Sequence, residues 1–250
     1  MLQLDGVAKG YLSEIFLSFQ GEGLLAGRRQ LFLRMSGCHL RCRYCDTPDS
    51  LERSATFRVY GHGEPFEGTN PLSTADVLSH ALPLLQVTGG AHGVAVTGGE
   101  PLLQADFLAE LLADARWPRP RMLETSGTQP DKLAVVLPVV DIVSMDIKLP
   151  SNTGESPFWE AHGRFLAAAC GKAYVKVLVD ADTDLDEVER AAALVRREAP
   201  DTVVFLQPIT GPQGQVDMSP DTLHRLFATA RRHVTDVRVL PQTHKMLGIQ

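Results

Sequence analysis

The sequence predicts an α/β fold, in the form of an open, partial (β/α) barrel with about six parallel strands. Apolar runs rich in β-branched residues alternate with segments of helical periodicity along most of the chain. Several of these runs are apolar at every position, which is typical of strands covered on both faces of a parallel sheet. About six strand–helix units are visible, fewer than a closed barrel needs.

The expected elements follow one another in a regular order. The expected strands are Leu31–Met35, Gly93–Thr97, Arg121–Glu124, Asp141–Asp146, Ala173–Val179, Thr202–Leu206 and Val237–Leu240. The helices expected between them are Ser73–Gln86, Leu103–Arg116, Pro157–Cys170, Leu185–Ala199 and Ser219–Arg232. The first helix begins with a serine followed by Asp76, a pattern typical of an N-terminal cap.

Two segments lack either periodicity and are expected to be loops. Residues 48–72 contain the run GHGEPFEG and are interpreted as a long loop or insertion. Leu149–Pro157 is polar and directly follows an expected strand. Loops at the carboxyl ends of parallel strands carry the chemistry in α/β folds. The whole chain, residues 1–250, is expected to form one domain.

The charge balance and the hydropathy pattern exclude several classes of protein. With 24 Lys and Arg against 30 Asp and Glu, the net charge is -6, and no arginine pair belongs to a longer basic run. Direct nucleic-acid binding is therefore not expected. No stretch of about 18 apolar residues is present, so no membrane span is expected. The N-terminus lacks the pattern of a signal peptide, so a cytoplasmic location is expected.

Three of the four cysteines are clustered in the run Cys38-His-Leu-Arg-Cys42-Arg-Tyr-Cys45, on the loop after the first expected strand. Clustered thiols favour a metal or iron–sulfur site over a disulfide framework. Three local ligands would leave one iron of a four-iron cluster open for a small molecule. The alternative is a structural zinc ion held by the three cysteines with His39 or a distant ligand. Cys170 is interpreted as a small buried residue.

The cysteine spacing, with an aromatic residue before the third cysteine, resembles that of the radical S-adenosylmethionine superfamily. Thr97-Gly98-Gly99-Glu100-Pro101, at the end of an apolar run, is similar to the GGEP motif of that superfamily. The resemblance implies a [4Fe-4S] cluster whose fourth iron binds the amino and carboxylate groups of S-adenosylmethionine. Glycines in the second motif would let the backbone approach the methionine amino group, because no side chain intervenes.

Four further segments more narrowly resemble the 7-carboxy-7-deazaguanine synthase family: Glu14–Gly23, Arg34–Cys38, Cys45–Thr47 and Gln242–Gly248. The resemblance implies conversion of 6-carboxy-5,6,7,8-tetrahydropterin to 7-carboxy-7-deazaguanine with loss of ammonia, in the route to queuosine and other 7-deazapurines. The alternative is an enzyme that generates a glycyl radical on a partner protein. Such an enzyme would share the cysteines and the GGEP motif, whereas the Gln20–Gly23 segment and the QTHK run favour a small substrate.

The resemblance implies the following substrate-binding residues: Phe19, Gln20, Gly21, Glu22, Arg34, Thr97, His244 and Gln250. The side chains of Gln20 and Glu22 can meet the planar donors and acceptors of a pterin edge. Arg34 lies in an otherwise apolar run, and a buried guanidinium needs an anion, either the substrate carboxylate or a structural ion-pair partner.

The C-terminal tail, residues 241–250, has two interpretations. His244 and Lys245 fit a frayed surface segment. In the family the tail instead folds back to close the site, and its terminal carboxylate reaches the substrate. This chain ends in Gln250, where relatives often end in proline.

The resemblance also implies ligands for cofactors and metals. S-adenosylmethionine would be bound by Tyr44, Cys45, Asp46, Gly99, Glu124, Ser126, Asp146, Ile147, Lys148, Gln207, Pro208, Ile209 and Thr210. Cys38, Cys42 and Cys45 would hold the cluster, and the hydroxyl of Thr47 would bind Mg²⁺, an ion that prefers oxygen ligands. The expected partners are the pterin substrate, a reducing partner such as flavodoxin or ferredoxin, and a second copy of the chain in a homodimer.

Overall fold

The computed structural model describes residues 8–61, 63–87, 89–169 and 171–249. Its framework is a ten-stranded sheet with the strand order β12-β11-β10-β9-β8-β7-β3-β2-β4-β5. Seven neighbouring strands are mutually parallel, and all seven were predicted from the sequence: β3 (Arg29–Met35), β7 (Val94–Gly98), β8 (Arg121–Thr125), β9 (Ile142–Asp146), β10 (Ala173–Val179), β11 (Val204–Pro208) and β12 (Val237–Val239).

Three further strands extend the sheet beyond β3. β2 (Leu12–Phe19) runs antiparallel to β3, and β4 (Thr56–Tyr60) and β5 (Phe66–Thr69) form a hairpin next to β2. The interpretation of residues 48–72 as a loop is therefore wrong. Phe57 and Val59 are buried while Thr56 and Arg58 are exposed, which is the alternation of a strand with one covered face.

A short two-stranded sheet, β1 (Lys9–Gly10) with β6 (Leu72–Ser73), completes the strands.

The five expected helices are confirmed: α1 (Thr74–Ala81), α2 (Ala105–Ala113), α5 (Trp159–Ala168), α6 (Leu185–Glu198) and α7 (Pro220–Arg231). Ser73 caps α1 and exchanges hydrogen bonds with Asp76, as its sequence pattern predicts. Three short helices were not predicted, because none is long enough to show a helical period: α3 (Pro130–Val136), α4 (Pro150–Thr153) and α8 (Thr243–Leu247). Because α4 lies inside Leu149–Pro157, that segment is not wholly a loop.

Short 3-10 turns join several of these elements: Gly23–Leu25, Pro48–Ser50, Leu82–Gln86, Pro101–Gln104 and Leu137–Val139.

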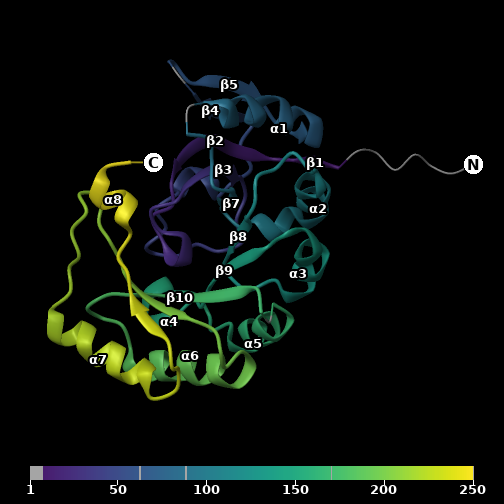
Figure 1. Cartoon of the computed structure of the whole chain (residues 1–250). Coiled ribbons are helices and arrows are strands. Elements are labelled where there is room, and N and C mark those ends of the chain that lie inside the picture. The colour runs from purple at the N-terminus through teal and green to yellow at the C-terminus, as the bar shows by residue number, and fades with distance from the viewer. Residues whose placement is uncertain (1–7, 62, 88, 170, 250) are drawn as a thin grey trace, which may run out of the picture.

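The helices cover one side of the curved sheet. Helices α2, α3, α5, α6 and α7 follow its outer side in succession, while α8 lies across the open side (Figure 1). Among the described residues the outermost strands, β12 and β5, do not pair with each other, so the sheet is an open one, as predicted. No helix in the described ranges is long and apolar enough to cross a membrane.

Alternation along β10 illustrates how the sheet separates the core from the site. Val175, Val177 and Val179 belong to the main apolar core. Lys176 and Leu178 point to the opposite face, where they line a cavity. All seven parallel strands end at the same edge of the sheet, so the residues at their carboxyl ends are brought together there.

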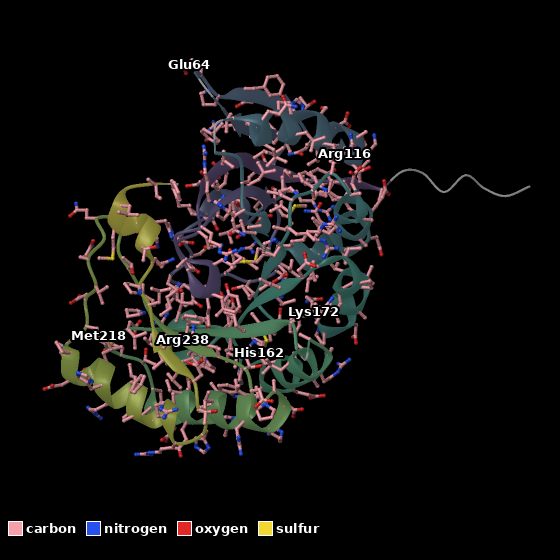
Figure 2. The ribbon with its side chains drawn as sticks, in the orientation of Figure 1. Glu64, Arg116, His162, Lys172, Met218 and Arg238 are labelled. Carbon is pink, nitrogen blue, oxygen red and sulfur yellow. The ribbon has the colours of Figure 1, made fainter. Side chains whose placement is uncertain are left out.

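A buried histidine lies between α5 and the sheet. His162 is fully buried in α5, and its Nε2 atom lies 3.2 Å from the carbonyl oxygen of Ser126, just after β8 (Figure 2). Burial lowers the pKa of His162 from 6.5 to about 4. The folded chain therefore favours the neutral imidazole.

We expect the free energy of unfolding to fall by about 3 kcal/mol as the pH decreases from 6.5 to 4 on account of His162 alone. In that range the unfolded chain binds a proton that the folded chain does not. Urea denaturation of wild type and His162→Gln at several pH values measures the effect, because the amide keeps a donor and does not titrate. The variant should lose this part of the pH dependence, whereas His224→Gln, at an exposed position, should keep it.

Candidate active site

Two adjoining cavities open at the carboxyl edge of the sheet. The cysteine cavity is lined by Cys38, Cys42 and Cys45 together with the ends of β7 to β11. The Arg34 cavity is lined by Arg34, by Phe19 to Glu22 after β2, and by His244 on α8. Six residues line both cavities and so form a shared wall: Glu22, Asp46, Thr47, Thr97, Gly98 and Glu124.

Most residues that the sequence singled out lie in these cavities. The cysteine cavity also contains Tyr44, Gly99, Ser126, Asp146, Lys148, Gln207 and Ile209. Ile147, Pro208 and Thr210 are buried beside it and do not line it. Gln250 and Cys170 lie outside the described residues.

The three cysteines lie on one loop after β3. The Leu40 amide donates to Cys38 Sγ over 3.4 Å, and burial raises the pKa of the Cys38 and Cys42 thiols. Within the described ranges, no three Cys, His, Asp or Glu side chains converge as ligands of a single metal ion. His39, the fourth ligand of the zinc alternative, instead hydrogen-bonds Thr128 Oγ1 at 2.8 Å. His39 therefore already has a protein partner, which removes the local fourth ligand that the zinc alternative would use.

The glycines of the GGEP motif serve close packing of the backbone. A Cβ atom on Gly98, whose φ is 121°, would lie 2.2 Å from the Met35 carbonyl oxygen, and one on Gly99 would lie 2.3 Å from the Gly37 carbonyl oxygen. The Glu100 amide donates to Gly37 O over 2.9 Å. The motif therefore fixes the start of the cysteine loop against β7, in addition to lining the cysteine cavity.

Glu100 stabilises the end of the neighbouring strand β8 through hydrogen bonds, a role that was not predicted from the sequence. Its fully buried carboxylate accepts hydrogen bonds from the Leu102 amide, the Thr125 hydroxyl, and both the amide and the hydroxyl of Ser126. Four donors satisfy a buried carboxylate without a cation.

Lys176 is the cation at the centre of the site, and the sequence analysis did not select it. Its ammonium group forms ion pairs with Glu22 and with Asp146, the latter at 3.2 Å. Lys148 also pairs with Asp146, at 2.8 Å. A charged residue inside the apolar run AYVKVLV was the available signal, and it is the same signal that identified Arg34.

The acidic side chains around the two cavities differ in the direction of their pKa shifts. Burial alone would raise the pKa of Glu22 and of Asp146, but Lys176 at both carboxylates and Lys148 at Asp146 hold those pKa values below the ordinary range. Burial raises the pKa of Glu124, whose hydrogen-bond donors are the neutral groups Gln20 Nε2 at 2.8 Å and Thr97 Oγ1 at 2.9 Å.

Arg34 has a partner within the protein. Its Nε atom lies 2.6 Å from Glu14 Oε2 on β2, and its guanidinium lies over the Phe16 ring, 5.2 Å from the centroid. The structural ion pair considered as an alternative is therefore present. Because Arg34 also lines the Arg34 cavity, its guanidinium is exposed to that space.

The C-terminal segment is docked on the site, so the interpretation as a frayed surface tail is wrong for the described part. The Thr243 amide donates to Gly21 O over 3.0 Å. Gln242 Nε2 donates to Glu22 Oε1 at 2.8 Å and to Asp46 Oδ2 at 3.0 Å, and Lys245 pairs with Asp46 at 3.0 Å. Sequence reasoning missed Gln242, whose amide connects two acids of the shared wall.

The donor set of the cysteine cavity fits a polar ligand beside a cluster. Gln207 is only 1% exposed, yet neither its amide nitrogen nor its amide oxygen has a hydrogen-bond partner in the protein. A buried amide without partners costs free energy unless a ligand or water satisfies it. Three thiols and this amide line the same cavity.

Comparison with known proteins agrees with this geometry. Residues 32–226 match the model of the radical SAM superfamily. A curated 7-carboxy-7-deazaguanine synthase from Geobacter sulfurreducens is 36% identical over 95% of this chain and 96% of its own length. The chain belongs to this family. The synthase from Methanopyrus kandleri is also 36% identical, over 94% of this chain and 92% of its own length.

Solved structures share the fold of this family member. QueE from Escherichia coli superposes with a TM-score of 0.62 at 23% identity, over 94% of both chains. A radical SAM methyltransferase from Sphaerobacter thermophilus superposes with a TM-score of 0.54 at 15% identity, over 86% of this chain and 70% of its own. Both similarities support the open α/β architecture.

We expect Cys38→Ala, Cys42→Ala and Cys45→Ala each to abolish assembly of an iron–sulfur cluster, because no other thiol lines the cavity among the described residues. Iron and sulfide content and the absorbance near 400 nm after anaerobic reconstitution measure the loss. Cys170→Ala is the matched control and should keep the cluster. A cluster retained by Cys38→Ala and lost by Cys170→Ala would contradict the assignment.

Proposed function

We propose that this protein is a radical S-adenosylmethionine lyase that converts 6-carboxy-5,6,7,8-tetrahydropterin to 7-carboxy-7-deazaguanine with release of ammonia. The observation that carries the proposal is the pair of adjoining cavities with a shared wall, one lined by three cysteines and the other by residues suited to a small planar anion. Family membership over nearly the full length supports it.

Cys38, Cys42 and Cys45 hold the [4Fe-4S] cluster, and the cysteine cavity holds S-adenosylmethionine. When bound, the cluster supplies one-electron reduction of S-adenosylmethionine, and hence a radical able to abstract hydrogen from substrate. The protein orients both ligands across the shared wall and excludes water from it. The unpartnered amide of Gln207 is a ligand for the nucleoside part of the cofactor.

The Arg34 cavity binds the pterin. Gln20, Glu22 and Glu124 offer one amide and two carboxylates to the donors and acceptors of the ring edge. Arg34 and His244 lie in the same cavity, where the guanidinium pairs with the substrate carboxylate alongside Glu14. The docked α8 makes this space suited to a small molecule, which disfavours the alternative of a glycyl-radical-activating enzyme acting on a large partner.

Finer parts of the proposal concern metal, partners and location. Thr47 lines both cavities and supplies a hydroxyl ligand to Mg²⁺. The chain, a single domain with its cluster loop at 38–47, works as a cytoplasmic homodimer and takes electrons from a flavodoxin or ferredoxin. The product enters the synthesis of queuosine or another 7-deazapurine.

Anaerobic turnover tests the activity directly. The reconstituted protein, given a reductant, S-adenosylmethionine and 6-carboxytetrahydropterin, should form 7-carboxy-7-deazaguanine and ammonia, as read by mass spectrometry and an ammonia assay. Formation of 5′-deoxyadenosine without 7-carboxy-7-deazaguanine would show a radical enzyme with another substrate. An intact cluster that yields neither 7-carboxy-7-deazaguanine nor 5′-deoxyadenosine would overturn the proposal.

We expect Arg34→Lys to weaken substrate binding by roughly one to two orders of magnitude, because a charged hydrogen bond contributes about 1.5–3 kcal/mol and lysine lacks the planar fork. Calorimetry with 6-carboxypterin, an unreactive analogue, measures the change. Arg58→Lys, an exposed arginine on β4, is the matched control.

A pterin without the carboxylate separates recognition from folding. It should bind wild type and Arg34→Lys about equally. If the two proteins bound it as differently as they bind 6-carboxypterin, Arg34 would serve only its ion pair with Glu14.

A further inference from the structure

Lys176 connects charged residues that line the two cavities. The parallel register of β9 and β10 places Lys176 beside Asp146, on the face that lines the cysteine cavity. Its side chain is only 6% exposed, so its ammonium group depends on protein partners for its solvation. The charges around it therefore decide where its nitrogen sits.

Its two ion-pair partners come from segments far apart in the sequence. Glu22 follows β2 and lines both cavities, whereas Asp146 ends β9 and lines only the cysteine cavity. Lys176 hydrogen-bonds Glu22 and forms an ion pair with Asp146, so one ammonium group joins the loop of the Arg34 cavity to the strand edge of the cysteine cavity. The distance between these carboxylates is limited by what one ammonium can span.

The other charged groups of the site do not make this connection. Glu124 also acts on Lys176 electrostatically. Lys148 forms an ion pair with Asp146, and Lys245 forms one with Asp46. Tyr174 and His244 complete the titratable groups that face Glu22 and Lys176. If Lys176 were neutral, Glu22 would keep its hydrogen bond from Gln242 but would lose its ion pair.

We propose that Lys176 is a positioning residue that couples the two cavities, so that a ligand in one fixes the carboxylate that receives the ligand in the other. This inference rests on the proposed function for the identity of the two ligands. The physical mechanism does not depend on those identities. A bound nucleoside that fixes the position of Asp146 also fixes Lys176, and Lys176 in turn fixes the position of Glu22 for the pterin. Such coupling is reciprocal, since it is a free energy shared by both sites.

Calorimetry on the cluster-reconstituted protein measures the coupling without turnover. The affinity for 6-carboxypterin is determined with and without saturating S-adenosylhomocysteine, an unreactive cofactor analogue. In wild type we expect the second ligand to raise the affinity about tenfold, within the range typical of coupled sites. In Lys176→Met the ratio should fall below about twofold.

Two further variants separate positioning from loss of a buried lysine. Lys172→Met removes an ammonium that donates to the backbone carbonyls of Leu137 and Val140 and lines neither cavity, so it should keep the wild-type ratio. Lys176→Arg keeps the charge and should restore most of the ratio. If Lys176→Met does not fold, the charge-balanced Lys176→Met/Glu22→Gln takes its place, and it too should lose the coupling.

Each outcome decides a different claim. Failure of wild type to bind either analogue would overturn the proposed function. Binding of both analogues with a ratio near one in wild type, or an unchanged ratio in Lys176→Met or its charge-balanced substitute, would overturn the inference alone. Weaker binding of both ligands with the ratio preserved would make Lys176 a structural residue.

Discussion

A single buried ammonium group holds the acids of this site in place. Carboxylates removed from water lose several kcal/mol of solvation each unless a cation or several donors replace it. Lys176 supplies that cation to Glu22 and Asp146. Glu100 uses the other solution, four donors and no cation, and Glu124 has only two neutral donors. Neighbouring buried carboxylates are thus stabilised in three different ways within one small region.

The sheet explains why these groups meet. Parallel strands bring their carboxyl ends to one edge, so residues separated by more than a hundred positions become neighbours there: the Arg43 amide, after β3, donates to the Thr153 carbonyl oxygen, after β9, over 3.0 Å. Close backbone packing at Gly98 and Gly99 fixes the cysteine loop to that edge. The docked C-terminal helix then adds Gln242 and Lys245 to the acids of the wall. The sheet, the loop of the three cysteines and the C-terminal segment therefore each supply part of the site, and none of them supplies all of it.

The parallel strands could be predicted because their side chains are apolar on both faces. The β4–β5 hairpin was missed because only Phe57 and Val59 reveal its covered face within a polar stretch. The cysteine and GGEP motifs identified residues that line the cysteine cavity, since chemistry limits which residue types can hold a cluster. Lys176 carried the same signal as Arg34, a charge in a strand, but its partners at residues 22 and 146 follow only from the strand register and the loop path.

The role of Glu100 could not be derived either, because its four donors belong to two segments that only the fold brings together. Local patterns predict elements and motifs, whereas the partners of buried charges depend on tertiary contacts.

The proposed function requires a hydrogen atom to pass from a pterin in the Arg34 cavity to the nucleoside in the cysteine cavity, across their shared wall. Turnover with 6-carboxytetrahydropterin deuterated at C6 tests it directly. The account predicts deuterium in the recovered 5′-deoxyadenosine. Product formation with unlabelled 5′-deoxyadenosine, and deuterium lost only to solvent, would contradict it.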